Sequence, residues 1–402
     1  MRTFGALGNR NFRLYFLSQL ISQCGNNMQV VGVAWLVLRA GGDGVALGGA
    51  IALQYGPLLL LGPFGGSLAD RFERRRYLCV TQGALGLAAV CFAVLCQAGS
   101  ANLTAVNVLV VVSGVIGALD LPGRQALLGD LVPPAQLNNA ISLNSVIVNV
   151  ARIIGPAIGG LLLGVGGVAL LFWLNAVSFG VVMLCLVLMR PLTEAARHAG
   201  APRATVRAGV RYVWNTRDLR VPLVMVGLLG MFAWEFQVTL PLLAAHFGGG
   251  EAQAYAFMLT ALGAGAVCGG VYSAWRGSAT ARGLVAATVF WAATLVGVAL
   301  APGYRTALLA VVFAGAGAVV FSAQSKTILQ RDSTPDMRGR VMALWVIAWQ
   351  GTTLVGAPIV GFVAQAWGPR WPFVLAGVAA AGAALLALPW GSTAQLPELN
   401  EG

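Results

Sequence analysis

Long apolar stretches follow one another along almost the whole chain, and they limit the possible folds more than any motif does. A helix needs about 20 apolar residues to cross a bilayer core about 30 Å thick. With 58% hydrophobic and only 9% charged residues, little of the chain is left to fold in water. We therefore predict an all-α membrane protein with twelve transmembrane helices. The predicted segments are 14–38, 47–69, 77–97, 104–127, 138–163, 168–189, 220–246, 251–274, 283–301, 306–328, 340–366 and 371–390.

The arginines gather in alternate connections between these segments. Those at 71–76, 190–220 and 331–340 fall on one side, whereas the connections on the other side are almost uncharged. Because cytoplasmic loops carry the excess of Lys and Arg, both termini are predicted to be cytoplasmic. The net charge of +12 then reflects topology and contact with anionic lipid at the cytoplasmic face, not nucleic-acid binding. The six cysteines stand singly without metal spacing, so neither a metal nor a cofactor is expected.

An internal repeat sets the predicted architecture. Residues 124–167 align without gaps with residues 325–368, and the alignment pairs Gly155 with Gly356. A duplicated chain of this kind predicts two pseudo-symmetric bundles of six helices, related by an axis along the membrane normal. In such transporters the substrate site lies near the midplane between the bundles.

The longest polar stretch separates the two copies of the repeat. We predict an N-terminal bundle over 1–190, a cytoplasmic linker over 191–219, and a C-terminal bundle with a short tail over 220–402. Within the linker, residues 204–217 combine arginines with apolar residues. This segment is either a helix lying on the cytoplasmic membrane interface or an ordinary solvated connection.

Four segments carry a recognisable family pattern. They are ADRFERRR at 69–76, ALDLPGRQALLGDLVPPAQLNNAISLNS at 118–145, NVARIIGPAIGGLL at 149–162 and PDMRGRVMALW at 335–345. In them the chain resembles the major facilitator superfamily, and more narrowly its branch of bacterial twelve-span drug and siderophore exporters, which includes enterobactin and macrolide efflux proteins. The resemblance covers essentially the whole chain. It implies the major facilitator fold, the bacterial inner membrane, transport by alternating access and function as a monomer.

The resemblance assigns gating roles to two groups of residues. The first group matches the gating motif between the second and third spans and comprises Gly66, Asp70, Arg71, Arg74 and Arg75. The second matches the antiporter signature of the fifth span and comprises Gly155, Pro156, Gly159 and Gly160. Asp70 either latches the cytoplasmic side, by pairing with arginines or with a helix N-terminus, or belongs to a cluster that only fixes topology. Where a second copy of the gating motif would stand, at 274–278, an arginine remains but no aspartate, so a gate there must work asymmetrically.

Three charged residues inside the predicted spans stand out, because an ionisable group at the centre of a membrane helix is costly and by default functional. Glu235 is the first candidate for a proton-carrying carboxylate, with a structural partner role as the alternative. Asp120 is the second candidate; it precedes Arg124 by one helical turn, so it forms either a gate or relay with Asp70 or a local ion pair. The third, Arg152, is a candidate cation of the substrate cavity.

Polar residues at helical spacing mark candidate cavity walls on the first, fifth and eleventh spans. For any one of them, the alternative is an ordinary hydrogen bond between helices. Tryptophans near these positions would stack on a substrate or serve in packing. The candidates for the substrate cavity are Gln19, Ser22, Asn26, Ser145, Asn149, Arg152, Trp234, Trp349, Gln350 and Thr353.

Taken together, these features favour proton-coupled export of a small, rather apolar or amphipathic molecule. Uptake of a small solute and a sensor without transport activity remain as alternatives. A membrane-embedded enzyme is disfavoured because the sequence has no P-loop, GxSxG, HExxH or paired metal-ligand pattern.

Overall fold

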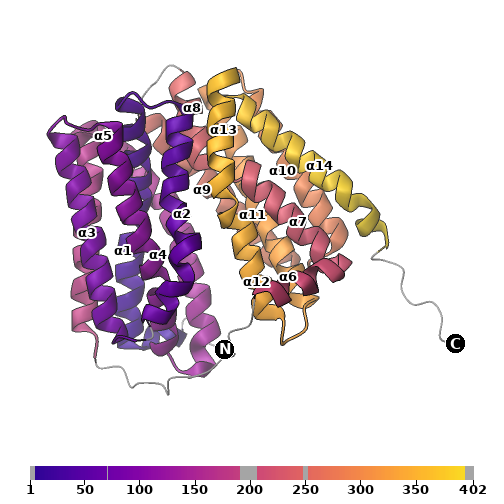
Figure 1. Ribbon diagram of the computed structural model, residues 1–402, viewed down its shortest axis with the longest axis horizontal. Coiled ribbons are helices and arrows are strands. Elements are labelled where there is room, and N and C mark those ends of the chain that lie inside the picture. The colour runs from indigo at the N-terminus through magenta and orange to yellow at the C-terminus, as the bar shows by residue number, and fades with distance from the viewer. Residues whose placement is uncertain (1–4, 70, 191–205, 248–251, 394–402) are drawn as a thin grey trace. The chain divides into compact units, whose positions relative to one another are not determined.

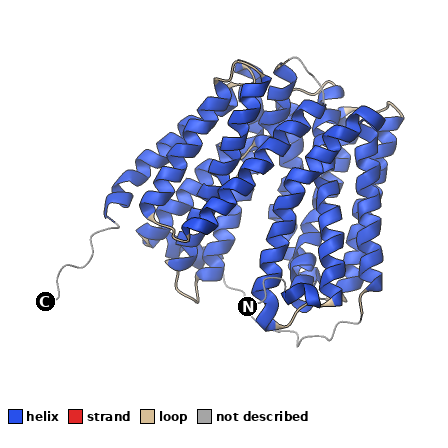
Figure 2. Cartoon of the chain, turned by 180° about the vertical axis from the view of Figure 1, so that it is seen from behind, coloured by secondary structure: helices blue, strands red, loops and turns tan. Residues whose placement is uncertain are grey.

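The computed structural model describes residues 5–69, 71–190, 206–247 and 252–393. Every regular element within these residues is helical, and Figure 2 shows long helices running side by side in bundles. Ten stretches of the described chain are long and apolar enough to cross a membrane, and one of them, Asn139–Leu188, is long enough to cross twice. The polar first helix is additional to these ten. The twelve predicted segments coincide with these helices, apart from short interruptions in the seventh and eleventh and differences of a few residues at their ends, so the predicted all-α membrane fold is confirmed.

The chain divides by its internal contacts into two units. Unit 1 comprises the described residues of 1–199 and 244–260, and unit 2 those of 200–243 and 261–402. The domain boundaries expected from the sequence stay a prediction. The helices of the first half are α1 (Arg10–Arg39), α2 (Gly44–Ala69), α3 (Arg74–Gln97), α4 (Leu103–Asp130) and α5 (Leu137–Leu188), with short 3-10 turns at Gly5–Gly8 and Pro134–Gln136. The remaining helices are α6 (Val206–Asn215), α7 (Arg217–Phe232), α8 (Phe236–His246), α9 (Ala252–Arg276), α10 (Ala281–Ala299), α11 (Tyr304–Arg331), α12 (Arg338–Val346), the π-helix η3 (Ile347–Gly351), α13 (Thr353–Trp367) and α14 (Trp371–Thr393).

The internal repeat of the sequence reappears in the helix boundaries. Helices α4 and α11 both contain 28 residues, and their first residues, Leu103 and Tyr304, are 201 positions apart. The same offset relates the chain breaks at Gly167 and Gly368, which have φ of 64° and 101°. Positive φ is open to glycine at little cost, and these glycines let the chain turn at the end of a span. In unit 1 the backbone at Gly167 leaves helical geometry, with φ of 64° and ψ of −169°, so α5 consists of two helices that meet at this glycine.

Glycines allow the closest helix contacts in each unit. In unit 1, α1 packs along α5, and a Cβ added at Gly155 would lie 2.8 Å from the carbonyl oxygen of Cys24. In unit 2, α7 packs on α13, and a Cβ at Gly356 would overlap the carbonyl oxygen of Met231. The aligned glycines of the repeat therefore serve the same purpose: they bring the fifth span against the first and the eleventh against the seventh, at backbone contact.

The linker contains the short helix α6, which falls within the segment singled out from the sequence. Figure 1 shows it beside α12, and a small apolar core fixes it there through Val213, which packs with Leu329 and Val341. The hydroxyl of Tyr212 accepts a hydrogen bond from the backbone N–H of Thr334 at 3.3 Å. Helix α6 is thus part of unit 2. Its position on a membrane interface stays a prediction.

Candidate functional site

Unit 1 holds a buried carboxylate, Asp120, that is fully supplied with partners. Its side chain on α4 is 1% exposed. The hydroxyl of Thr81 and the amide of Gln82, both on α3, donate to Oδ1 at 2.7 and 2.8 Å, and Nε of Arg124 lies 2.6 Å from Oδ2. Arg124 also donates to the amide oxygen of Gln19 on α1 at 3.2 Å. We call these five residues the Asp120 cage. Charge pairing and two donors offset the cost of burying the carboxylate.

The polar stripe expected on the first span faces the interior of unit 1. Gln19 and Ser22 are 4% and 3% exposed, and Asn26 accepts a 3.4 Å hydrogen bond from Asn175 in the second half of α5. The same amide donates to Gln29 at 2.6 Å. Within the described structure, residues of the stripe therefore form hydrogen bonds between helices, which was the alternative to lining a cavity. A role for them in lining a substrate cavity stays a prediction.

The arginines of the gating motif bind the ends of neighbouring helices. Arg74 forms an ion pair with Asp130, the last residue of α4, and Arg75 donates to the carbonyl oxygens of Val187 and, at 3.3 Å, Met189 at the end of α5. Carbonyls at a helix C-terminus lack partners within the helix, so a guanidinium there is stabilising. Arg71 is exposed. Gly66 lies in α2, whereas Asp70 lies outside the described residues, so the expected latch through it stays a prediction.

The fifth span combines exposed polar residues with a packed glycine face. Ser145 and Asn149 bond to backbone carbonyls of their own helix at 3.1 and 2.8 Å, and Ser145 is exposed. Arg152, partly buried, lies within electrostatic range of Tyr55 on α2. Of the antiporter signature, Pro156 is buried inside the helix. The glycines of the signature meet neighbours of unit 1: Gly155 meets Cys24 and Asn27, Gly159 meets Met28, and Gly160 meets Ala256.

Unit 2 places its buried carboxylate at a break in a span. The seventh predicted span consists of α7 and α8, and residues 233–235 between them are not helical. Glu235 is 3% exposed; Thr353 on α13 hydrogen bonds to its side chain, and Oε1 has no hydrogen-bond partner among the described residues. Irregular backbone at membrane depth is tolerated only where protein or a polar cavity surrounds it. Broken helices of this kind form ion and substrate sites in transporters.

A second irregularity lies opposite the first. The eleventh span changes from α-helix to π-helix over Ile347–Gly351 and then continues as α13. Gly230, near the end of α7, packs against this turn, because a Cβ there would lie 2.6 Å from the carbonyl oxygen of Ala348. Single π-turns inside α-helices are frequent at functional sites. Among the predicted residues of this span, Thr353 is buried against Glu235, whereas Gln350 is exposed.

Four large aromatic rings surround Trp349 beside these irregular turns. The ring of Trp349 lies 4.9 Å from that of Trp234 and 5.7 Å from that of Trp345, to which it is nearly parallel at 8°. Phe321 and Trp291 follow at 6.0 and 6.2 Å. The two tryptophans predicted from the sequence therefore meet, and Trp234 joins the ring cluster directly to Glu235, the next residue along the chain.

Sequence reasoning missed several residues of these sites. Lys326, the only lysine of the chain, is exposed on α11, and its Nζ lies 5.8 Å from the ring centre of Trp345. A charge two residues from the end of the predicted span 306–328 was a usable signal. Thr81, Gln82 and Asp130 carried a weaker one, because isolated polar residues reveal no partner until the helices are packed.

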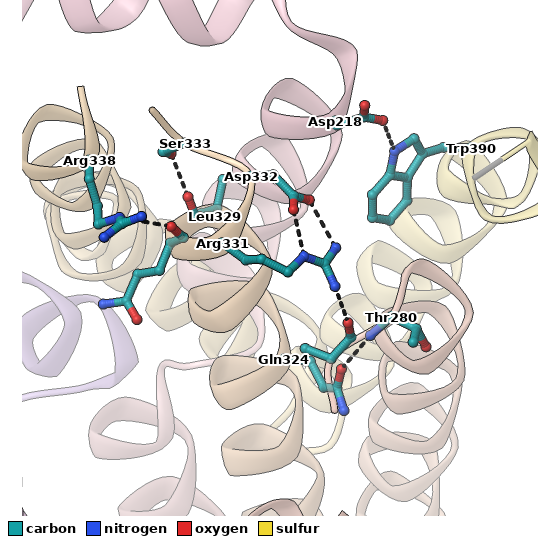
Figure 3. Close-up of polar contacts among 11 residues, drawn as sticks. Asp218, Thr280, Gln324, Leu329, Arg331, Asp332, Ser333, Arg338 and Trp390 are labelled. Atoms are coloured by element: carbon teal, nitrogen blue, oxygen red, sulfur yellow. Dashed lines mark hydrogen bonds and ion pairs between the residues drawn. The ribbon is translucent and has the colours of Figure 1, made fainter. Parts of the chain in front are cut away.

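Figure 3 shows the polar contacts at one end of unit 2. Arg331 forms an ion pair with Asp332 at 2.6 Å and donates to the carbonyl oxygen of Ala279 at 2.8 Å. Gln324 accepts from the backbone N–H of Thr280 at 3.2 Å. The connection before α10, where a second gating motif would stand, is thus held through its backbone. No aspartate of that connection takes part.

The sequence matches, over residues 1–401, a family described as transmembrane secretion effectors within the major facilitator superfamily. The chain belongs to this family. It is 26% identical over 354 residues to the enterobactin exporter EntS of Escherichia coli, covering 87% of this chain and 84% of that protein. It is 30% identical over 184 residues to the staphyloferrin A transporter of Staphylococcus aureus, covering 45% of this chain and 46% of that transporter, so this match spans about half of each protein.

Solved structures of transporters share the fold. The nucleoside transporter NupG superposes with a TM-score of 0.78 at 10% identity, covering 94% of this chain and 98% of that one. A bacterial homologue of the iron transporter ferroportin gives 0.74 at 17% identity, covering 95% and 99%. The major facilitator transporter is therefore an integral protein of the bacterial inner membrane and not an enzyme.

Proposed function

We propose that this major facilitator transporter exports a small amphipathic molecule in exchange for protons, by alternating access. The observation that carries the proposal is the placement of Glu235: a buried carboxylate at a break in the seventh span, in contact with Thr353 next to the π-turn of the eleventh. Removing a carboxylate from water disfavours its ionised form unless cations or donors compensate. A group that binds and releases a proton as its surroundings change is the component that proton coupling requires.

The relatives support the proposed direction and substrate class. One is named as an exporter of enterobactin and another as a transporter of staphyloferrin A. We therefore assign export, and a siderophore is the first substrate to test. The residues of the proposed site lie at the break between α7 and α8, in η3 and in α13. These are the spans with irregular helices, in accord with a site near the middle of the membrane.

Gating is assigned to the polar contacts of the gating motif and of the Asp120 cage. Arg74 and Arg75 tie the start of α3 to the ends of α4 and α5, so a movement of this region displaces three helices together. Asp70 is proposed to latch the cytoplasmic side. Asp70→Asn then slows turnover more than it weakens substrate binding, because the lost pairing stabilises only one of two conformations. If Asp70→Asn protein shows unchanged transport and unchanged spin-label distances between the two halves, Asp70 does not act as a latch.

We also propose cytoplasmic termini, function as a monomer and contact with anionic lipid. A groove of about 300 Å³ in unit 2 supports the lipid contact: its walls include Trp214, Val224 and Leu386, and Arg220 also lines it. Trp214 and Leu386 are 61% and 71% exposed. The groove suits an acyl chain with its anionic headgroup at the guanidinium. Native mass spectrometry tests this lipid contact. The native protein is expected to retain phosphatidylglycerol in preference to phosphatidylcholine, whereas Arg220→Gln protein is expected to retain the two lipids equally. A preference for phosphatidylglycerol that survives the substitution contradicts the proposal.

Transport in proteoliposomes tests the function as a whole. Purified protein is reconstituted with an imposed pH gradient, and the movement of radiolabelled enterobactin and staphyloferrin A is followed. The proposal predicts accumulation of at least one of them against its own gradient on the side from which protons leave, and collapse of this accumulation on addition of a protonophore. Accumulation that persists after the proton gradient is removed would contradict proton coupling. Proton-driven accumulation in the same direction as proton flow would establish uptake instead.

A further inference from the structure

Lys326 is the starting point, because its charge has no acidic counterpart. It lies on α11 within a predicted span, and its side chain is exposed. No carboxylate of the described residues forms an ion pair with it. Its recorded partner is the face of Trp345, 5.8 Å from Nζ. An aromatic face satisfies an ammonium group only in part, so donors remain for a further group.

The ring of Trp345, on α12, is held in place by a residue of α11, the helix that carries Lys326. Its indole N–H donates to the hydroxyl of Ser325 at 3.3 Å, and that hydroxyl in turn donates to the carbonyl oxygen of Ser322 at 3.0 Å. Ser325 is fully buried. The neighbour of Lys326 along the chain thus orients the ring over which Lys326 lies, and the two side chains are positioned as a pair.

The pair forms one end of a row of aromatic rings with opposite charges at its ends. From Lys326 the row passes through Trp345 and Trp349, whose rings are parallel, and continues to Trp234 at 4.9 Å. The next residue is Glu235. An exposed ammonium group beside the half-buried ring of Trp345 matches a molecule that carries an acidic group on an aromatic body.

We propose that Lys326 and Trp345 form a binding subsite for the anionic group of an aromatic acid, a carboxylate or phenolate attached to a flat ring. The ammonium group pairs with the anion, and the ring stacks on the exposed part of Trp345. This inference rests on the proposed function, because it gives the substrate class for the same region of unit 2. Lysine presents a compact charge with three donors and thus accepts acids of different geometry.

A matched pair of probes isolates the charge. Binding of tritiated 2-naphthoate, and competition by its neutral amide 2-naphthamide, is measured by scintillation proximity on the full-length protein in phosphatidylcholine nanodiscs without a pH gradient. The native protein is expected to bind the acid about tenfold more tightly than the amide, a difference of about 1.4 kcal/mol. Lys326→Met removes this preference and leaves amide binding unchanged, whereas Lys326→Arg keeps it.

Further variants separate a binding role from a structural one. Trp345→Leu weakens the acid and the amide alike, because both use the ring. Arg276→Gln, which removes an exposed charge elsewhere in unit 2, leaves both affinities unchanged. Repeating the measurement with phosphatidylglycerol in the nanodiscs distinguishes the free acid from a lipid headgroup: naphthoate affinity that stays constant supports the subsite, and affinity abolished by the lipid assigns Lys326 to lipid instead.

Equal affinity of the native protein for acid and amide, or a preference that survives Lys326→Met, overturns the proposal. These outcomes are independent of the proposed function, because binding is measured without transport. Acid-selective binding in a protein that fails to move substrate against a gradient would leave the subsite standing and refute proton-driven export. Proton-driven export without acid-selective binding would support the proposed function and refute the subsite.

Discussion

Among the described residues each unit buries one carboxylate, and the surroundings of these two acids are opposite in kind. Asp120 in unit 1 has the guanidinium of Arg124, one turn away on the same helix, and two donors from the neighbouring helix α3. Glu235 in unit 2 has a hydrogen bond with Thr353, lies beside non-helical backbone and leaves Oε1 without a partner in the described part of the chain. Charge pairing and hydrogen-bond donors offset the cost of burying an acid, so such a group stabilises the fold. An acid with few partners can change its protonation state at low cost, and this contrast is why we propose coupling for Glu235 and a gating contact for Asp120.

The duplication makes the contrast informative, because α4 and α11 are copies of equal length. At the position equivalent to Arg124 stands Ser325, which orients a tryptophan, and at the position equivalent to Asp130 stands Arg331, which holds a backbone carbonyl. The repeat therefore preserved helix lengths and contact glycines while the charges diverged. Divergence of the charged positions is expected, because helix packing depends on shape whereas the charges serve separate roles in the two halves.

The largest loss of stability is expected for Asp120→Asn. The substitution leaves Arg124 without its counter-charge in a site that is almost closed to water. Breaking a buried ion pair from one side costs about 3 to 5 kcal/mol. The free energy of unfolding, measured by SDS titration in mixed micelles, is expected to fall by this amount.

A double substitution sharpens that result. Asp120→Asn combined with Arg124→Gln removes both charges and is expected to cost less than the sum of the two single changes. Simple additivity, or an Asp120→Asn protein as stable as the native one, would mean that the cage does not support unit 1.

The next largest effects concern the aligned glycines. Gly356→Ala forces a methyl group into the carbonyl of Met231, and Gly155→Ala forces one to 2.8 Å from that of Cys24. Both are expected to lose about 1 to 3 kcal/mol in the same titration, with Gly356→Ala the worse. Gly227→Ala is the matched control, because no atom lies within 4 Å of its added Cβ, and replacing a helical glycine there is expected to be neutral or stabilising. Equal losses at all three positions would contradict the close-contact role.

A smaller effect is expected for Arg74→Gln. Its pair with Asp130 is partly buried, with side-chain exposures of 31% and 18%, so about 1 kcal/mol of stability is expected to be lost. Arg76→Gln serves as control, because that arginine is 85% exposed and pairs only with Glu73 of the same motif. If the two substitutions have the same effect on the free energy of unfolding, the ion pair between α3 and the end of α4 does not contribute to stability.

The sequence was sufficient for the twelve spans, because length and apolar composition decide which segments cross a membrane. It also indicated the pairing of Asp120 with Arg124, since both lie on one helix at a fixed spacing. Thr81 and Gln82 escaped prediction because they meet Asp120 only once α3 and α4 pack. The break at 233–235 escaped it too: these residues contain neither Gly nor Pro, and the irregular backbone is seen only in its contacts with the eleventh span.

The smallest effect on stability, and the most direct test of the account, belongs to Glu235→Gln. The amide keeps the shape of the side chain and removes a charge that has no ionic partner in the described structure, so unfolding is expected to change by less than about 1 kcal/mol. In proteoliposomes, exchange of labelled substrate without a gradient is expected to continue, while accumulation driven by a pH gradient is lost. Glu235→Gln protein that still drives accumulation with the pH dependence of the native transporter would show that another group carries the proton.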